Sequence, residues 1–230
     1  MRLPLRASAA IGVLVFAIVC ISSSAQRAQS ADAYQKGVAN FTVVVDAAGN
    51  VFAAGVGGVK ANGGGKKPTV LQLNNMRNGV VWFPSVLGKV SCCGNSPGTF
   101  NGPEGGTNAG GVTDIQSTGG ISGIIDKKRT MFLVGVFVGY PGPSAPGPAR
   151  RDVTYDSGKQ DIYPILDQTF YIGTGKVLSG GSTFQKYHIP QGANRLALGF
   201  ADGQGFHGPP GAFDDNFGHL DVKVMAGPQY

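Results

Sequence analysis

Residues 195–224 decide the fold of this chain and read RLALGFADGQGFHGPPGAFDDNFGHLDVKV. The runs at 196–200 and 220–224 are apolar or alternate apolar with polar residues, as buried and half-buried β-strands do. The loop between them is rich in Gly and Pro, and it carries Asp202 at one end and Asp214-Asp215-Asn216 at the other. We expect a hairpin-like closure, which would bring these carboxylates and the amide together.

Residues 202–216, the acidic loop, have two interpretations on composition alone. Carboxylates held close together repel one another unless a cation lies between them. Carboxylate, amide and backbone carbonyl oxygens favour Ca²⁺ over softer metals. The alternative is an Asx-rich turn, in which Asp and Asn side chains only cap backbone amides.

The composition favours an all-β protein. Of the 230 residues, 38 are Gly, 14 are Pro and 14% are charged, and Glu104 is the single Glu. Long solvent-facing helices usually carry many Glu and Lys, so this composition indicates strands joined by turns. The apolar fraction, 42%, is enough for an ordinary core, and the length suits one domain.

The N-terminus is typical of a secretory signal peptide. Arg2 and Arg6 precede an apolar run at 9–21 that is too short to span a membrane comfortably, and Ser23-Ser24-Ala25 is a small-residue cleavage site. The mature protein is therefore expected to be exported and soluble, in the periplasm, at the cell surface or secreted, with no membrane as partner. The expected segments are a signal peptide at 1–25, a flexible N-terminus at 26–38, one domain at 39–226 and a tail at 227–230.

The basic residues do not indicate nucleic-acid binding. Without Arg2 and Arg6 the chain keeps 17 of its 19 Lys and Arg against 13 Asp and Glu, a net charge of +4. The basic clusters are Lys66-Lys67, Lys127-Lys128-Arg129 and Arg150-Arg151, each short and without interleaved aromatic residues. A nucleic-acid footprint needs a continuous basic stripe, so these clusters predict solvated loops and strand ends.

A series of apolar and alternating runs fits a two-sheet β-sandwich. The run at 130–138 is the most apolar of the mature chain and predicts a central core strand. A helical turn is expected near 161–166, and 94–120 is expected to be a long surface loop. The expected strands lie at 40–46, 51–54, 70–73, 80–83, 86–91, 121–125, 130–138, 168–172, 183–189, 196–200 and 220–224.

Cys92 and Cys93 are the cysteines left once the signal peptide has been removed with Cys20. Exported proteins meet oxidising conditions, so the two thiols are not expected to stay reduced. One alternative is a vicinal disulfide, which is strained because adjacent Cα atoms lie about 3.8 Å apart. The other alternative is pairing between chains, and the residues alone leave both open.

The order of these motifs resembles the PA-IL-type calcium-dependent galactose-binding bacterial lectins. In that family a strand ending Tyr-Asn-Asp leads through a Pro-Gly loop to Tyr-Gly-Asn-Asn-Ser-Gly and a closing strand. Here Gly199-Phe-Ala-Asp202 leads to Pro210-Gly-Ala-Phe-Asp-Asp-Asn-Phe-Gly218. Upstream, Gly88-Lys-Val-Ser-Cys-Cys-Gly94 lies where the family has its first calcium-ligating carbonyl, and Phe100-Asn-Gly-Pro-Glu-Gly105 resembles a Trp-Gly-Pro-Gln-Gly turn.

This resemblance implies a galactose-binding-like jelly roll, calcium as the cofactor and carbohydrate as the partner. Residue by residue, it implies that the side chains of Asp202, Asp215 and Asn216 ligate calcium. The backbone carbonyls of Ala212 and of Cys92 or Cys93 would complete the protein ligands, with Cys93 preferred. Asp215 stands where the lectins have Asn, which adds negative charge to the site.

The residues that would contact the sugar depart from the lectin pattern. The family's His and Gln contacts fall near 107–110, where this sequence has no His or Gln. Residues 140–168 are extra relative to the lectins. Further candidates for ligand contact are Asp214, His207, Thr107 and Asn108.

Over nearly the whole mature chain, the sequence also resembles exported bacterial proteins that end in a Pro-Glu-Pro sorting tail. The shared runs are Val-Ser-Cys-Cys, Gly-Ile-Ser-Gly-Ile-Ile and Arg-Thr-Met-Phe-Leu-Val-Gly-Val-Phe. The last residues here, Ala226-Gly-Pro-Gln-Tyr230, do not carry such a tail. This second resemblance implies export.

The carboxylates and histidines of the sequence do not form a recognisable catalytic pattern. A glycosidase needs two positioned carboxylates, one of them protonated, but Glu104 is single and the Asp of the acidic loop are expected to hold metal. His188, His207 and His219 show neither H-E-x-x-H spacing nor a zinc grouping. We expect a non-catalytic, calcium-dependent carbohydrate-binding or cell-surface protein. The alternatives are a structural envelope or matrix protein that uses calcium only to stabilise the loop, and a hydrolase acting on polysaccharide.

Overall fold

The computed structural model describes residues 37–55, 63–73, 76, 78–179 and 181–228. The expected signal peptide, most of 26–38 and the end of the expected tail lie outside these residues. The body that they form begins at Ala39. It confirms the all-β expectation, since the described residues contain strands and short 3₁₀ helices but no α-helix. None of the described helices is long and apolar enough to cross a membrane.

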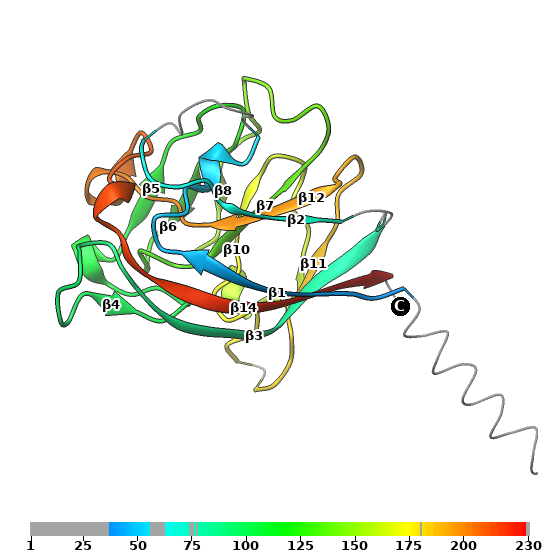
Figure 1. Cartoon of the computed structure of the whole chain (residues 1–230), viewed down its shortest axis with the longest axis horizontal. Helices are drawn as coiled ribbons and strands as arrows, with labels where there is room; N and C mark the ends of the chain where they lie inside the picture. The colour runs from blue at the N-terminus through cyan, green and yellow to red at the C-terminus, as the bar shows by residue number, and fades with distance from the viewer. Residues whose placement is uncertain (1–36, 56–62, 74–75, 77, 180, 229–230) are drawn as a thin grey trace, which may run out of the picture. The chain divides into compact units, whose positions relative to one another are not determined.

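The first and largest sheet has the strand order β1-β14-β3-β11-β9, and β4 also pairs with β3. Figure 1 shows β1, β14 and β3 side by side. The antiparallel pairing of β3 and β14 runs from Phe217 opposite Ser91 to Pro228 opposite Gly79. It therefore continues past 226, the expected end of the domain. The strands are β1 (Ala39–Asp46), β3 (Gly79–Ser91), β4 (Phe100–Asn101), β9 (Asp161–Ile162), β11 (Lys186–His188) and β14 (Phe217–Pro228).

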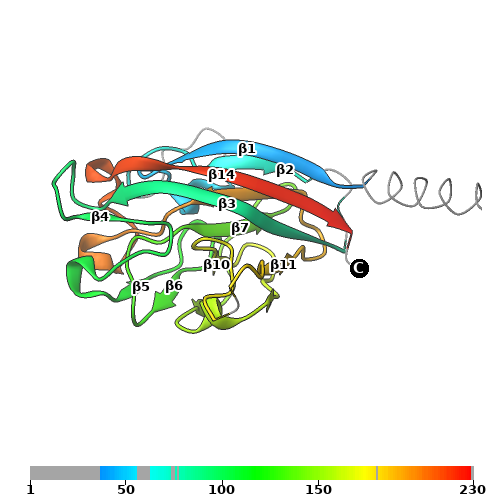
Figure 2. The same ribbon diagram turned by 90° about the horizontal axis from the view of Figure 1, so that it is seen from below.

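The second sheet has the order β10-β7-β12-β2. Strand β7 lies between two partners and all its residues are buried, as expected for the central strand of the 130–138 run. In Figure 2, β1, β14 and β3 form one layer, and β7 and β10 lie in the layer below it. The strands are β2 (Thr69–Gln72), β7 (Val134–Val138), β10 (Thr169–Tyr171) and β12 (Arg195–Gly199).

A third, smaller sheet has the order β13-β5-β6-β8. It joins three segments that local patterns predicted as loops or connections, namely 94–120, 140–168 and the acidic loop. Strand β13 pairs in parallel with β5, and β8 in parallel with β6, so each pairing depends on distant sequence. The strands are β5 (Thr113–Ile115), β6 (Ile124–Asp126), β8 (Arg151–Asp152) and β13 (His207–Gly208).

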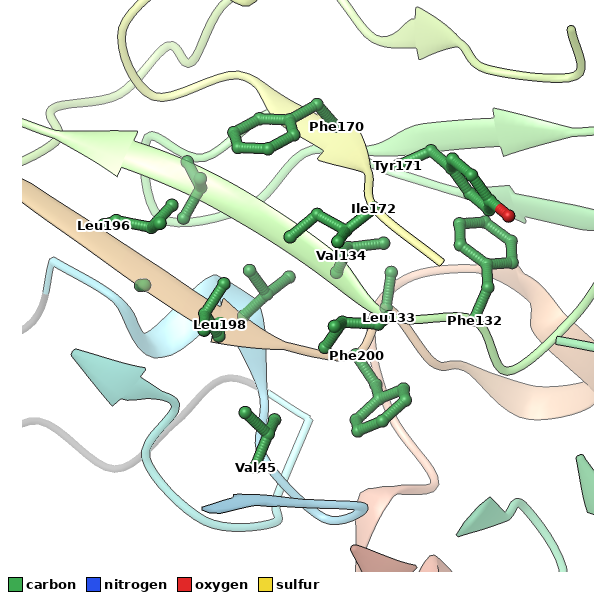
Figure 3. Close-up of a cluster of buried hydrophobic side chains, with 14 of the residues drawn as sticks. Val45, Phe132, Leu133, Val134, Phe170, Tyr171, Ile172, Leu196, Leu198 and Phe200 are labelled. Atoms are coloured by element: carbon green, nitrogen blue, oxygen red, sulfur yellow. The ribbon is translucent and has the colours of Figure 1, made fainter. Parts of the chain in front are cut away.

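One hydrophobic core joins these sheets. Figure 3 shows part of it, with Val45 from β1, Val134 from β7, Phe170 from β10 and Leu198 from β12 among the labelled side chains. All four side chains are completely buried. Burying a side chain of this size stabilises a fold by about 1.5–3 kcal/mol, so the apolar runs seen in the sequence hold the layers together.

Three expectations about local structure are wrong. Residues 51–54 form a 3₁₀ turn, η1 (Val51–Ala53), because Asn50 Oδ1 accepts a hydrogen bond from Phe52 N and caps it. The segment 161–166 begins with β9 instead of a helical turn, because Ile162 pairs with Tyr187. The strands that flank the acidic loop do not form a hairpin, since β12 belongs to the second sheet and β14 to the first.

Candidate cation site in the acidic loop

The acidic loop crosses from the second sheet to the first, and the turn at 47–50 after β1 holds its two ends together. At one end, Ala47 N donates to Gly218 O at 3.0 Å. At the other end, Phe200 N donates to Gly49 O at 2.8 Å. The closure that the sequence predicted from a hairpin is therefore supplied by a third segment, distant in sequence.

Asp202 is a buried carboxylate at the start of the loop, with 2% of its surface exposed. Its Oδ1 accepts a hydrogen bond from Gly203 N at 2.7 Å, whereas Oδ2 has no hydrogen-bond partner among the described residues. Burial raises the pKa of Asp202 to about 7, against the lowering by Gly203 N–H and the Asn216 side chain, and repulsion from Asp215 adds to the rise. A buried carboxylate oxygen without a donor costs free energy that a bound cation would offset.

Asn216, at the far end of the loop, presents a second unpaired oxygen. It is 9% exposed, and its Nδ2 donates to Ala47 O at 3.2 Å while Oδ1 has no partner among the described residues. The side chain lies close enough to Asp202 to lower the pKa of that carboxyl, although it makes no hydrogen bond to Oδ2. Two buried, unpaired oxygens thus come from opposite ends of one loop.

Asp215 and the cysteine pair lie side by side. Gly94 N donates to Asp215 O at 2.7 Å, and β3 ends at Ser91, opposite Phe217. The structure joins Cys92 and Cys93 in a vicinal disulfide, with Cys92 buried and Cys93 exposed. The Asp215 side chain is exposed, and its charge raises the pKa of Asp202.

Ala212 and Asp214 belong to the turn that leads into these ligand candidates. Ala212 is exposed and adopts a left-handed conformation, with φ of 61°, before η5 (Phe213–Asp215). Asp214 is also exposed, and its Oδ1 accepts a hydrogen bond from Gly65 N at 2.9 Å. Asp214 therefore fastens the segment 63–65 to the loop.

The other candidates for ligand contact lie around η4 (Gln204–Phe206). Thr107 is exposed and precedes η2 (Asn108–Gly110), which packs against η4. Asn108 Nδ2 donates to Thr99 O at 2.7 Å, and Asn108 O accepts from Thr130 Oγ1 at 2.8 Å. His207 is exposed, and its Nδ1 lies 2.7 Å from Gly205 O. Asn108 and His207 are thus held by local bonds.

The oxygen atoms of the acidic loop are of the kinds that ligate a cation such as Ca²⁺. Within the part of the chain that the structure describes, no three or more His, Cys, Asp or Glu side chains gather as a metal-holding group. The acidic loop instead offers the Asp202 and Asp215 carboxylates, the Asn216 amide oxygen and nearby backbone carbonyls. Ca²⁺ accepts oxygens of these three kinds, whereas Zn²⁺ sites are built from Cys, His and carboxylate ligands.

A Gly-x-Ser-x-Gly match at 94–98 directly follows the disulfide. In α/β-hydrolases this motif forms a sharp turn between a strand and a helix. Here the motif lies between the strands β3 and β4, and Ser96 O accepts a hydrogen bond from Thr99 Oγ1 at 2.7 Å. It therefore lacks the structural context of a nucleophile elbow.

The sequence reasoning missed the residues that position the ligand candidates. Ala47 accepts the Asn216 amide, and Asn50, which is completely buried, donates from Nδ2 to Gly64 O at 3.1 Å. In the sequence these residues belong to the run Asp46-Ala-Ala-Gly-Asn50, which predicts a turn and nothing more. Nothing in that run indicates that it contacts a loop more than 150 residues away, as the separation of 169 between Ala47 and Asn216 requires.

Comparison of the chain with models of known protein families, with curated proteins and with solved structures gave no match.

Proposed function

We propose that this protein is an exported, non-catalytic, calcium-dependent carbohydrate-binding protein of the periplasm, cell surface or extracellular space. The proposal includes a two-sheet β-sandwich with galactose-binding-like jelly-roll topology as its fold. The observation that carries it is the pair of unpaired buried oxygens, Asp202 Oδ2 and Asn216 Oδ1. Both belong to the loop that resembles the calcium loop of the PA-IL-type lectins.

Charge and ligand number support calcium at this place. Asp202 and Asp215 carry two negative charges when ionised, which one Ca²⁺ neutralises, while the Asn216 oxygen adds a dipole without repulsion. Carbonyls of Ala212 and Cys93 would add two more oxygens. Ca²⁺ takes six to eight oxygen ligands, so the protein leaves coordination positions that vicinal hydroxyls of a sugar would fill.

A second candidate is a structural envelope or matrix protein in which calcium only stabilises the loop. The burial of Asp202 and Asn216 favours it, because a cation ligated by these two oxygens is partly withdrawn from solvent. The same cation would tie the two ends of the acidic loop to each other. The two candidates therefore share the calcium site and differ in whether a glycan binds there.

A glycan array with calcium and with chelator separates the two candidates. Glycan binding that is lost in chelator supports the carbohydrate-binding function. A melting temperature that rises with calcium, without glycan binding, supports the structural function. Asp202→Ala should abolish the calcium response, while Asp221→Ala should preserve it, because Asp221 is an exposed residue of β14 outside the loop. A calcium response that survives Asp202→Ala would contradict both candidates.

A further inference from the structure

A cleft of about 300 Å³ lies outside the acidic loop. Residues 128–129, 154–155, 157–158 and 178–179 form its walls. Pockets that hold small ligands begin at about this volume. One wall comes from the segment 140–168, which is extra relative to the lectins and which the acidic-loop proposal does not use.

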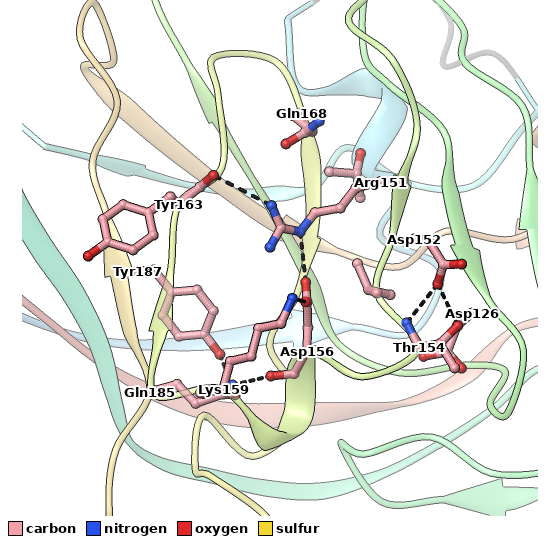
Figure 4. A network of polar contacts seen from close by, with 12 residues as sticks. Asp126, Arg151, Asp152, Thr154, Asp156, Lys159, Tyr163, Gln168, Gln185 and Tyr187 are labelled. Atoms are coloured by element: carbon pink, nitrogen blue, oxygen red, sulfur yellow. Dashed lines mark hydrogen bonds and ion pairs between the residues drawn. The ribbon is translucent and has the colours of Figure 1, made fainter.

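Buried polar contacts hold in place the segment 154–158, which supplies one wall. Asp156 is 1% exposed, and its two carboxylate oxygens accept hydrogen bonds from Arg151 Nε at 2.7 Å and Lys159 Nζ at 2.8 Å (Figure 4). Gln185 Nε2 donates to Asp156 O and Lys159 O, at 2.7 Å each. The cleft is therefore preformed, which reduces the ordering cost of binding.

The remaining walls are tied to this one by backbone and guanidinium contacts. Leu178 N donates to Ser157 O at 2.9 Å. Arg129 binds the buried Asp126 carboxylate through Nε and Nη2, at 2.9 and 2.6 Å, and Nη2 also reaches Thr154 O at 3.4 Å. The Arg129 charge is thus already matched by Asp126.

Lys128 differs from Arg129 in having no carboxylate partner in the part of the chain that the structure describes. Its ammonium lies 4.2 Å from the centroid of the Tyr155 ring. Tyr155 nevertheless stays 70% exposed and Leu178 61% exposed. The cleft therefore combines an aromatic ring and an aliphatic side chain, both open to solvent, with a cation that makes no ion pair with the described carboxylates.

We propose that this cleft binds an acidic saccharide unit of the uronate class, independently of calcium. The Tyr155 ring offers an apolar surface to the C–H face of a sugar ring. The Lys128 ammonium would pair with the sugar carboxylate, and the Ser157 and Ser179 hydroxyls, on the cleft wall, would hydrogen-bond sugar hydroxyls. A neutral sugar would leave the Lys128 charge unmatched, so the acidic form is preferred.

The test is a calorimetric titration of the protein with galacturonate and mannuronate hexamers in excess EDTA. EDTA removes calcium from the acidic loop, so that binding seen here is separate from the function proposed above. We expect saturable binding of at least one uronate, and binding weaker by about fivefold for methyl-esterified galacturonate, which keeps the ring and loses the charge. Raising the salt concentration should weaken the binding, because the Lys128 contact is exposed and screened.

Two cleft variants and two matched controls locate the site. Lys128→Gln should weaken binding about fivefold and Tyr155→Ala about tenfold, as expected for the loss of roughly 1 kcal/mol or slightly more. Lys89→Gln and Tyr163→Ala should leave affinity unchanged, since both are exposed residues outside the cleft.

Asp202→Ala should also leave uronate binding in EDTA unchanged. Equal binding of the acid and the ester, wild-type affinity in both cleft variants, loss of binding in Asp202→Ala, or no saturable binding at millimolar uronate would each overturn the proposal.

Discussion

The Asn216 side chain donates a hydrogen bond to the carbonyl oxygen of Ala47 at 3.2 Å, and this bond decides which way the amide faces. Because Nδ2 is used, Oδ1 remains the Asn216 atom without a partner among the described residues. The turn after β1 therefore orients a candidate ligand atom of the acidic loop.

Asn216→Asp tests this arrangement, because it keeps oxygens at the site and removes the donor to Ala47. In chelator we expect the free energy of unfolding to fall by about 1–3 kcal/mol, the cost of an unpaired buried acceptor. Calcium should recover much of that loss, since the new carboxylate is also a ligand. Urea unfolding with and without calcium measures both, with Asp221→Asn as control. Unchanged stability of Asn216→Asp in chelator would refute the role of the Ala47 bond.

The raised pKa of Asp202 predicts that the stability of the calcium-free protein depends on pH. In the unfolded chain this carboxyl loses its proton near pH 4, whereas burial keeps the folded pKa at about 7. Between these values the folded state binds more protons at Asp202, so the contribution of Asp202 to stability is greatest below pH 4 and is lost as pH rises to about 7. One proton gives a slope of at most about 1.4 kcal/mol per pH unit.

Asp202→Asn should remove this slope between pH 4 and 7 in urea unfolding carried out in EDTA. In the wild-type protein, calcium should stabilise more at pH 8 than at pH 5, because protons compete for the same carboxylate. A wild-type slope that persists in Asp202→Asn would assign the titration to another group.

Asp214 and Asp215 are adjacent and exposed, yet we expect them to respond differently to substitution. Asp215→Asn should weaken calcium binding, because it removes a formal charge whose field reaches Asp202. Asp214→Asn should leave calcium affinity nearly unchanged, since Asp214 Oδ1 is used by Gly65 N. Calcium titration of the two variants by calorimetry measures the contrast, and equal losses would show that both carboxylates serve the site.

Asp156→Asn tests the anchoring of the segment 140–168. We expect a loss of about 1.5–3 kcal/mol, because two charge-assisted hydrogen bonds, from Arg151 and Lys159, are weakened at a buried carboxylate. Asp161→Asn is the matched control: its contact with His188 is exposed and should be worth no more than about 1 kcal/mol. Chemical unfolding compares the two, and equal losses would mean that Asp156 is not an anchor.

The sequence by itself determined the fold class and the positions of the long strands. Few Glu and many Gly and Pro excluded long surface helices, and the apolar run at 130–138 marked the buried strand β7. These features are local, because strand propensity and alternation depend only on consecutive residues. The prediction of a strand at 51–54 was wrong because the Asn50 side chain caps a 3₁₀ turn there.

Only the tertiary structure decided how the acidic loop is closed. Its flanking runs look like the two arms of a hairpin, yet β12 and β14 pair in different sheets and the turn at 47–50 joins them. The sequence also did not predict the short strands β5, β8, β9 and β13. Two or three residues carry no periodicity, and they form a strand only when a distant segment pairs with them. The sequence could name Asp202 and Asn216 as candidates, but their burial and their unpaired oxygens depend on contacts across more than one sheet, which no local pattern encodes.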